Sequence, residues 1–168
     1  MKPYQIYSKR TTQTPSSANS AVPVLNLALK PQRDGESVIV GGLTSDPQFL
    51  WEFVVGFSQN GQAFGTLIRH IESNRFIRAN SGSMEGGGVT LVTADEIDAY
   101  CGWLLGNNNT TGDTPFVPIV SLPTSGNTWL VLNIKGDESL EGSQIVTYPY
   151  LGEGNDTWAL QLKTDVTR

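Results

Sequence analysis

Three tryptophan-containing segments recur along this 168-residue chain at nearly equal intervals, around Trp51, Trp103 and Trp158. A polar residue lies within an apolar segment 25 positions before each tryptophan. These polar residues are Asn26, Arg78 and Asn133. A short β-branched run that follows a glycine lies between the two in every copy. Self-similarity at a fixed period indicates that one structural unit is repeated three times.

Short runs rich in β-branched and aromatic residues cover most of the chain, and Gly, Pro, Asn, Asp and Ser separate them. No long segment has helical periodicity, and residues 94–100 predict at most a turn or two of helix. The pattern predicts twelve strands, four in each copy. They span residues 4–9, 24–29, 37–40, 50–55, 65–71, 76–80, 89–93, 102–105, 116–122, 129–134, 144–148 and 157–163.

A four-stranded unit of this size cannot bury both of its faces alone. Three such units around a pseudo-threefold axis can close a barrel, which removes the exposed strand edges. We therefore predict an all-β fold, a β-trefoil that forms a single domain over residues 1–168. Its repeats would span approximately residues 1–60, 61–112 and 113–168. A β-sandwich with a similar number of strands is the alternative.

The charge balance excludes several classes of partner. The chain has 11 Lys and Arg against 16 Asp and Glu, a net charge of −5. Proteins that bind nucleic acid or anionic membranes usually carry a basic patch, so we expect neither partner. No apolar stretch reaches the length of a membrane span, which argues against membrane insertion. The first residues contain no apolar leader, so we expect a cytoplasmic protein, with unconventional export as the alternative.

Catalytic and metal-binding constellations are scarce. His70 is the single histidine and Cys101 the single cysteine, so the sequence predicts no catalytic residue, no metal site and no cofactor. A Cys101–His70 dyad is conceivable, but Cys101 stands beside Trp103, where a small buried residue is expected. The glycine-rich residues 82–88 lack the Lys-Ser/Thr ending of a phosphate loop and predict a hairpin.

The tryptophans at equivalent positions are expected to fill the core of the barrel. Trp129 has no counterpart in the other copies. We expect it to pack against a strand end, with an exposed platform as the alternative.

The order of these segments resembles the ricin B-chain-type β-trefoil lectins, and most of all the disulfide-free mushroom lectins. The likeness extends from Tyr4 to Lys163 and includes a W-x-apolar strand at the end of each repeat. Where that family has Gln two places before Trp, this chain has Phe49, Cys101 and Asp156. The resemblance implies a non-enzymatic protein that binds glycans or glycoproteins at shallow sites, one per repeat. A homodimer would multiply weak sites.

The resemblance also implies which residues would bind sugar. In the third repeat Asn133 takes the polar position and Tyr148 the stacking position, and Lys135, Asn155 and Asp156 lie nearby. In the first repeat Asn26 and Gln48 match, and Asp46 could compensate for Gly41 at the stacking position. In the second repeat Arg78 stands at the polar position and Val92 at the stacking position, which predicts a degenerate site. The expected carbohydrate-binding residues are Asn133, Lys135, Tyr148, Asn155, Asp156, Asn26, Asp46 and Gln48.

Two other functions fit a β-trefoil. A protease inhibitor, directed at cysteine or serine proteases, would act through a protruding loop such as residues 11–20 or 106–115. A signalling or cytoskeletal module is the third class.

Overall fold

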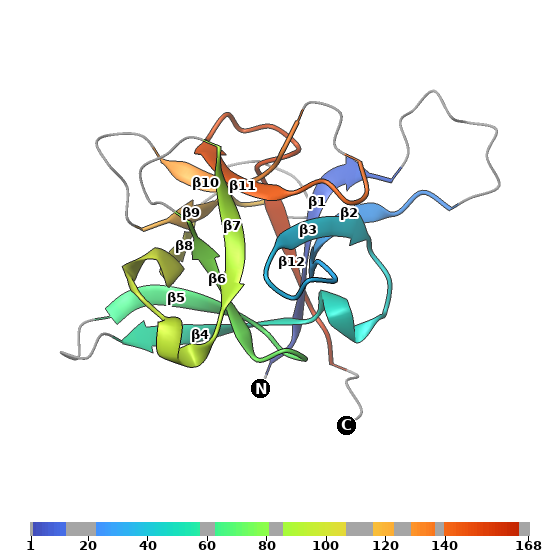
Figure 1. The fold of residues 1–168 in the computed structure, drawn as a ribbon. Coiled ribbons are helices and arrows are strands. Elements are labelled where there is room, and N and C mark those ends of the chain that lie inside the picture. The colour runs from blue at the N-terminus through green and yellow to red at the C-terminus, as the bar shows by residue number, and fades with distance from the viewer. Residues whose placement is uncertain are drawn as a thin grey trace.

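The computed structural model describes residues 2–12, 23–57, 63–80, 86–106, 116–122, 129–136 and 140–164. Its strands follow one another in three groups of four (Figure 1). The first group is β1 (Tyr4–Thr11), β2 (Asn26–Pro31), β3 (Val38–Gly42) and β4 (Trp51–Phe57). The second is β5 (Ala63–His70), β6 (Arg75–Ala79), β7 (Gly87–Val92) and β8 (Trp103–Leu105). The third is β9 (Ile119–Ser121), β10 (Leu130–Ile134), β11 (Ile145–Pro149) and β12 (Trp158–Leu162).

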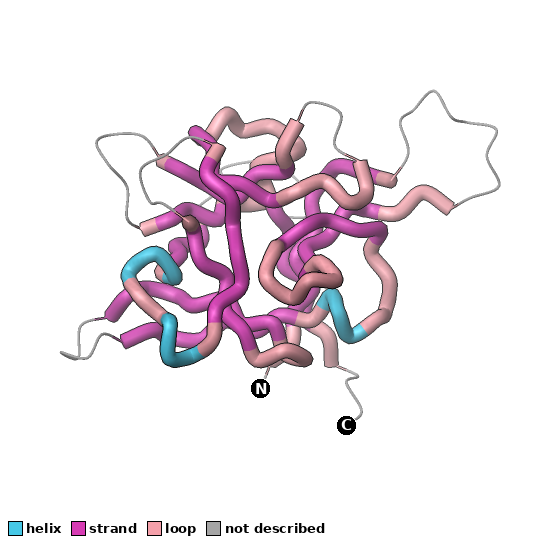
Figure 2. The backbone as a smooth tube through the Cα atoms, in the orientation of Figure 1, coloured by secondary structure: helices cyan, strands magenta, loops and turns pink. Residues whose placement is uncertain are grey.

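Short 3₁₀ helices occupy the segments before two of the tryptophan strands (Figure 2). η2 (Pro47–Phe49) precedes β4, whereas η3 (Ala94–Glu96) and η4 (Ala99–Cys101) precede β8. The last two lie where the sequence predicted a turn or two of helix. Among the described residues, no helix is long and apolar enough to cross a membrane.

The first and last strands of each group form a barrel. β1 pairs with β4 and β12, β4 pairs with β5, and β8 pairs with both β5 and β9, all antiparallel. A bridge between Val117 and Trp158 joins the segment before β9 to β12 and completes the ring. The first and last strands of the chain therefore lie side by side in the β1–β12 pair (Figure 1).

The two middle strands of each group form a hairpin, and the three hairpins are joined to one another. β2 pairs with β3, β6 with β7, and β10 with β11. Single bridges then connect Ser37 to Thr90 and Ile39 to Gln144, and β7 pairs with β11. A barrel with a ring of three hairpins around one axis is a β-trefoil, so the predicted fold is confirmed and the β-sandwich is excluded.

The core lies along the axis and draws equally on the three repeats. Trp51, Trp103 and Trp158 are fully buried, as predicted. Each barrel strand that opens a repeat adds one fully buried isoleucine: Ile6, Ile68 and Ile119. Burial of these large side chains is the main favourable contribution to folding.

Two predictions require correction. β9 spans Ile119–Ser121, shorter than the expected residues 116–122, because Pro118 has no N–H to donate to a neighbouring strand. Trp129 was expected to pack against a strand end, but 59% of its surface is exposed. The alternative interpretation, an exposed aromatic platform, describes Trp129 correctly.

Candidate functional site

The buried tryptophans show which residues of the three repeats are equivalent. The indole N–H of Trp51 donates to the carbonyl oxygen of Leu29 at 3.0 Å. Trp103 donates in the same way to Ile77 at 3.1 Å, and Trp158 to Leu132 at 2.9 Å. The residues that follow these three carbonyls therefore occupy one structural position. They are Lys30, Arg78 and Asn133.

This equivalence corrects the spacing inferred from the sequence. The hydrogen bond spans 26 residues in the second and third repeats but only 22 in the first. Lys30, and not Asn26, is therefore the counterpart of Asn133. The amide nitrogen of Asn26 instead donates to the carbonyl oxygen of Ser8 at 2.9 Å.

Cross-strand pairing gives the same alignment. Leu29 faces Val40, Ile77 faces Leu91, and Leu132 faces Thr147. The residues after the last three partners are Gly41, Val92 and Tyr148, which the sequence had already placed at one stacking position. The hairpin of the first repeat is therefore the shortest of the three. The segment from the hairpin to the tryptophan has nearly the same length in all three repeats.

A pocket of about 340 Å³ lies on the third repeat. Four of the expected sugar-binding residues line it: Asn133, Lys135, Tyr148 and Asn155. Asn133 comes from β10, Tyr148 from β11, and Asn155 from the turn before β12. Gly86, Gly136, Val146, Leu151 and Glu153 complete the lining. Residues from opposite strands of one hairpin and from a later turn thus meet at a single concave site.

The two asparagines form the polar floor of this third-repeat pocket. The Nδ2 atom of Asn155 donates to Oδ1 of Asn133 at 3.3 Å, and Asn133 is only 5% exposed. The Oδ1 atom of Asn155 is buried and has no hydrogen-bond partner among the described residues. A buried acceptor without a partner is costly, and a donor group in the pocket would satisfy it.

Asp156 has a different position from the other expected residues. Its side chain is fully buried, and Oδ2 accepts hydrogen bonds from the backbone N–H of Leu151 at 2.7 Å and of Gly152 at 3.1 Å. Burial raises the pKa of this carboxyl group, while the backbone N–H donors act against the rise. Asp156 therefore shapes the turn that carries Leu151 and Glu153 to the pocket.

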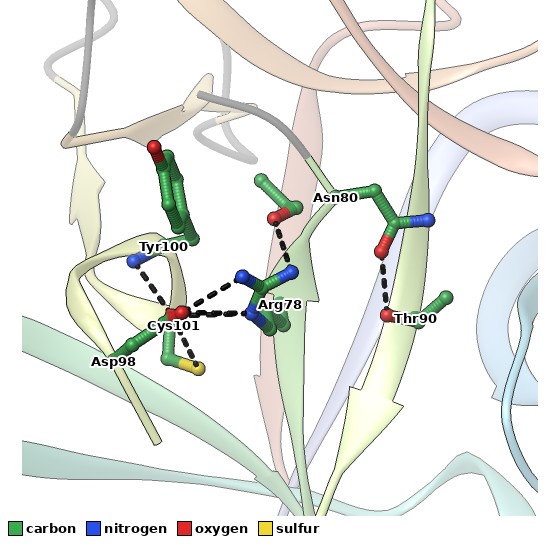
Figure 3. Close-up of polar contacts among 7 residues, drawn as sticks. Arg78, Asn80, Thr90, Asp98, Tyr100 and Cys101 are labelled. Carbon is green, nitrogen blue, oxygen red and sulfur yellow. Dashed lines mark hydrogen bonds and ion pairs between the residues drawn. The ribbon is translucent and has the colours of Figure 1, made fainter. Parts of the chain in front are cut away.

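The second repeat holds an ion pair at the equivalent position (Figure 3). The guanidinium of Arg78 contacts Asp98 through Nε at 3.1 Å and Nη2 at 2.7 Å. The Tyr100 ring lies 5.1 Å from the guanidinium carbon, and Tyr100 stands three residues before Trp103, as Asn155 does before Trp158. The hydrogen bonds from Arg78 to Asp98 raise the pKa of the guanidinium. The cation thus already has its counter-charge.

A second pocket, of about 650 Å³, occupies the corresponding place on the first repeat. Lys30 and Gln48 line it, together with His70, which was not expected to belong to a site. The other lining residues are Pro31, Gln32, Arg33, Ile39, Glu72 and Ser73. Asp46 lies outside this lining, and its carboxylate caps η2 by accepting from the backbone N–H of Gln48 at 3.0 Å.

His70 fixes one wall of the first-repeat pocket. Its Nε2 atom lies 3.1 Å from the carbonyl oxygen of Gln48, and Nδ1 accepts from the backbone N–H of Ser73 at 3.2 Å. These partners require the neutral ring with the proton on Nε2. Burial lowers the pKa of His70, which favours the same neutral form. The Gln48 backbone is therefore held at a fixed place beside Lys30.

His70 and Cys101 have different hydrogen-bond partners and form no hydrogen bond with each other. His70 contacts Gln48 and Ser73, whereas the Cys101 sulfur lies 3.8 Å from a carboxylate oxygen of Asp98. Burial raises the pKa of the Cys101 thiol to about 11. Within the described residues, no group of three or more His, Cys, Asp or Glu side chains could hold a metal ion.

Comparison with known proteins rests on structure alone, since the sequence matches no family profile and no curated protein. ThreeFoil, a designed threefold-symmetric protein, superimposes with a TM-score of 0.68 at 16% identity, covering 95% of this chain and 97% of its own. A Macrolepiota procera ricin B-like lectin, solved with lactose, gives 0.65 at 13% identity, with coverages of 95% and 94%. The chain has the fold of the ricin B-like lectins.

Another solved structure with this ricin B-like fold is the C-half of an earthworm R-type lectin in complex with GalNAc. It superimposes with a TM-score of 0.58 at 18% identity, covering 97% of this chain and all of the other. These neighbours give no support to the protease-inhibitor alternative. The loops proposed for an inhibitor lie mostly outside the described residues, which omit residues 13–20 and 107–115.

Proposed function

We propose that this protein is a lectin and that its third-repeat pocket binds the ring of a neutral sugar. The observation that carries the proposal is the buried Oδ1 atom of Asn155, an acceptor that lacks a partner among the described residues. It belongs to a pocket that also contains the half-buried Tyr148. A sugar hydroxyl would supply the missing donor.

The remaining lining suits the two kinds of surface that a sugar offers. A pyranose ring has an apolar C–H face and several neighbouring hydroxyl groups. The Tyr148 ring can cover the apolar face, while Asn133 and the exposed Glu153 carboxylate offer further hydrogen-bonding groups. Concave sites that combine apolar lining with a few fixed polar groups are typical for small ligands.

The structural neighbours support the same class of ligand. The Macrolepiota lectin was solved with lactose and the earthworm lectin with GalNAc. A shallow site of this kind gives weak affinity on its own, so the proposal includes a homodimer that presents several sites to one glycoprotein. Analytical ultracentrifugation at micromolar concentration tests this part of the proposal.

A glycan array followed by isothermal titration tests the function. The array identifies a neutral sugar, and titration then compares the unmodified chain with Asn155→Ala and Tyr148→Ala. Each variant should weaken binding at least tenfold, because the first removes the amide and the second removes the stacking surface. Asn26→Ala is the matched control, since the Asn26 amide bonds to Ser8 and lies away from the pocket.

Two outcomes would contradict the proposal. One is an array on which no neutral glycan binds. The other is a sugar whose affinity is unchanged in both pocket variants while they remain folded by circular dichroism. Inhibition of a papain-like protease together with an empty array would favour the inhibitor function.

A further inference from the structure

The first repeat differs from the third repeat at the two positions that correspond to Asn133 and Tyr148. Lys30 replaces Asn133, and Gly41 replaces Tyr148. A Cβ atom on Gly41 would lie 2.9 Å from Cε of Lys30, so the glycine leaves the space across which the lysine chain lies. The Lys30 ammonium is 5.8 Å from the centre of the Phe49 ring. The aromatic stacking surface of the third repeat is thus replaced by a cation.

The charge of Lys30 is not neutralised within the described residues. The ion pairs found there join Arg69 to Glu52 and Arg78 to Asp98. In the second repeat, Asp98 stands five residues before the tryptophan and neutralises the cation at the position of Lys30. Asp46 has the same place in the first repeat and caps the backbone of Gln48 as Asp98 caps that of Tyr100, but it forms no ion pair with Lys30. The cation of the second repeat therefore has a counter-charge within the protein, whereas the cation of the first repeat has none among the described residues.

The surroundings of Lys30 add a second cation and several polar groups. Arg33 lines the mouth of the pocket, and it too forms no ion pair among the described residues. Glu72 is the one carboxylate in the lining, and His70 is held neutral by its two hydrogen-bond partners. Asp34, which follows Arg33, uses its carboxylate on the backbone N–H groups of Glu36 and Ser37. The lining thus has an excess of positive charge in a chain whose net charge is −5.

We propose that the first-repeat pocket binds the anionic group of an acidic glycan, a sugar carboxylate or sulfate, with Lys30 as its principal counter-charge. Arg33 supplies a second cation at the mouth, and the side chains of Gln32 and Gln48 are available for the neighbouring hydroxyl groups. Hydrogen bonds between ionised partners are stronger than neutral ones, so the anion would add affinity to that of the neutral ring. This inference rests on the proposed lectin function, because it treats the pocket as a second glycan site.

Isothermal titration with a matched set of ligands tests the inference. Lactose is compared with sialyllactose and with lactose sulfated on galactose, all at 50 mM salt, using the unmodified chain, Lys30→Gln and Arg33→Gln. The unmodified chain should bind the acidic ligands about tenfold more tightly than lactose. Lys30→Gln should abolish this preference, Arg33→Gln should reduce it, and 0.5 M salt should weaken it in the unmodified chain.

Lys9→Gln is the matched control. The Lys9 ammonium also lies over an aromatic ring, 4.9 Å from the centre of Phe116, but outside the pocket. This variant should keep the full preference for acidic ligands. Unchanged thermal unfolding of Lys30→Gln, followed by circular dichroism, would show that a lost preference does not come from misfolding.

The results separate this inference from the proposed function. Asn155→Ala should lose lactose binding yet keep Lys30-dependent binding of the acidic ligands. If lactose binds but acidic ligands bind no more tightly, or if their preference survives Lys30→Gln, the inference is wrong and the lectin function stands. If no neutral glycan binds while the acidic preference depends on Lys30, the neutral third-repeat site is wrong and the inference stands. Inorganic sulfate that competes as well as the sulfated sugar would show an anion site without glycan recognition, and would overturn the inference.

Discussion

The indole N–H of Trp51 donates to the carbonyl oxygen of Leu29, 22 residues earlier in the chain. The corresponding bonds of Trp103 and Trp158 reach back 26 residues. The same buried contact therefore forms in each repeat, although the first hairpin is shorter. This single relationship aligns the three repeats and places Lys30 where the third repeat has Asn133.

The indole bonds should contribute measurably to stability. Trp158→Phe keeps most of the buried volume but leaves the Leu132 carbonyl without its donor. A buried acceptor that loses its partner costs about 1–3 kcal/mol, so the free energy of unfolding should fall by that amount in urea denaturation followed by circular dichroism. Trp129→Phe is the control, because Trp129 is mostly exposed. Equal losses in the two variants would show that the indole bond contributes nothing.

Asp156 should matter for both stability and sugar binding. Asp156→Ala leaves the backbone N–H groups of Leu151 and Gly152 without the buried carboxylate that accepts from them. We expect a loss of about 2 kcal/mol in the free energy of unfolding and weaker binding at the third-repeat pocket, which Leu151 lines. Asp46→Ala also removes a carboxylate that accepts from a backbone N–H, but at an exposed cap, so it should cost about 1 kcal/mol or less. A full-affinity Asp156→Ala protein would contradict this role.

His70 should make the protein less stable as the pH falls. Burial lowers the pKa of His70 in the folded chain below its ordinary value of 6.5. The unfolded chain therefore takes up the proton first, and the free energy of unfolding should decrease as the pH drops below about 6.5 toward the folded pKa.

Melting temperatures measured between pH 7.5 and pH 5 test this dependence. The groups that face the ring are the Gln48 carbonyl, the Ser73 hydroxyl and backbone N–H, and the Trp51 indole. The charged groups in the same lining are Lys30, Arg33 and Glu72. His70→Gln should flatten the dependence over this range. An unchanged slope in His70→Gln would assign the effect to another group.

Cys101 should be inert in the folded protein. Its side chain is fully buried and its pKa is raised to about 11, so at pH 8 about one thiol in a thousand is ionised. Labelling with a chromogenic disulfide reagent should be at least a hundredfold slower in buffer than in 8 M urea. Complete labelling of the native protein within seconds would show that the thiol is accessible.

Much of the fold follows from local patterns in the sequence. Alternating apolar residues, glycine-rich turns and a tryptophan in every fourth strand are sufficient to predict a β-trefoil, because each feature acts within a few residues. The third-repeat pocket could also be anticipated, since Asn133, Tyr148 and Asn155 stand at the positions that the resemblance to the ricin B-type lectins implies for sugar binding. These predictions required no knowledge of how one repeat packs on another.

The register of the first repeat could not be predicted in this way. Side chains in a strand alternate between two faces, so moving β2 by four residues leaves every apolar residue on the same face. Asn26 and Lys30 are therefore equivalent by pattern, and only the long-range bond from Trp51 to Leu29 distinguishes them. The sequence did not predict Lys30 and His70 as site residues. Their pocket forms only where η2 and the β5–β6 turn contact the short first hairpin.

The sequence by itself thus determined the three repeats, the twelve strands and the buried tryptophans. Tertiary structure alone decided what each repeat presents at its equivalent surface. It turned Asp156 inward onto two backbone N–H groups, paired Arg78 with Asp98, and left Lys30 without a counter-charge among the described residues. The physical reason is that hydrogen bonds and ion pairs depend on distances between residues far apart in the chain, whereas strand patterning depends on neighbours.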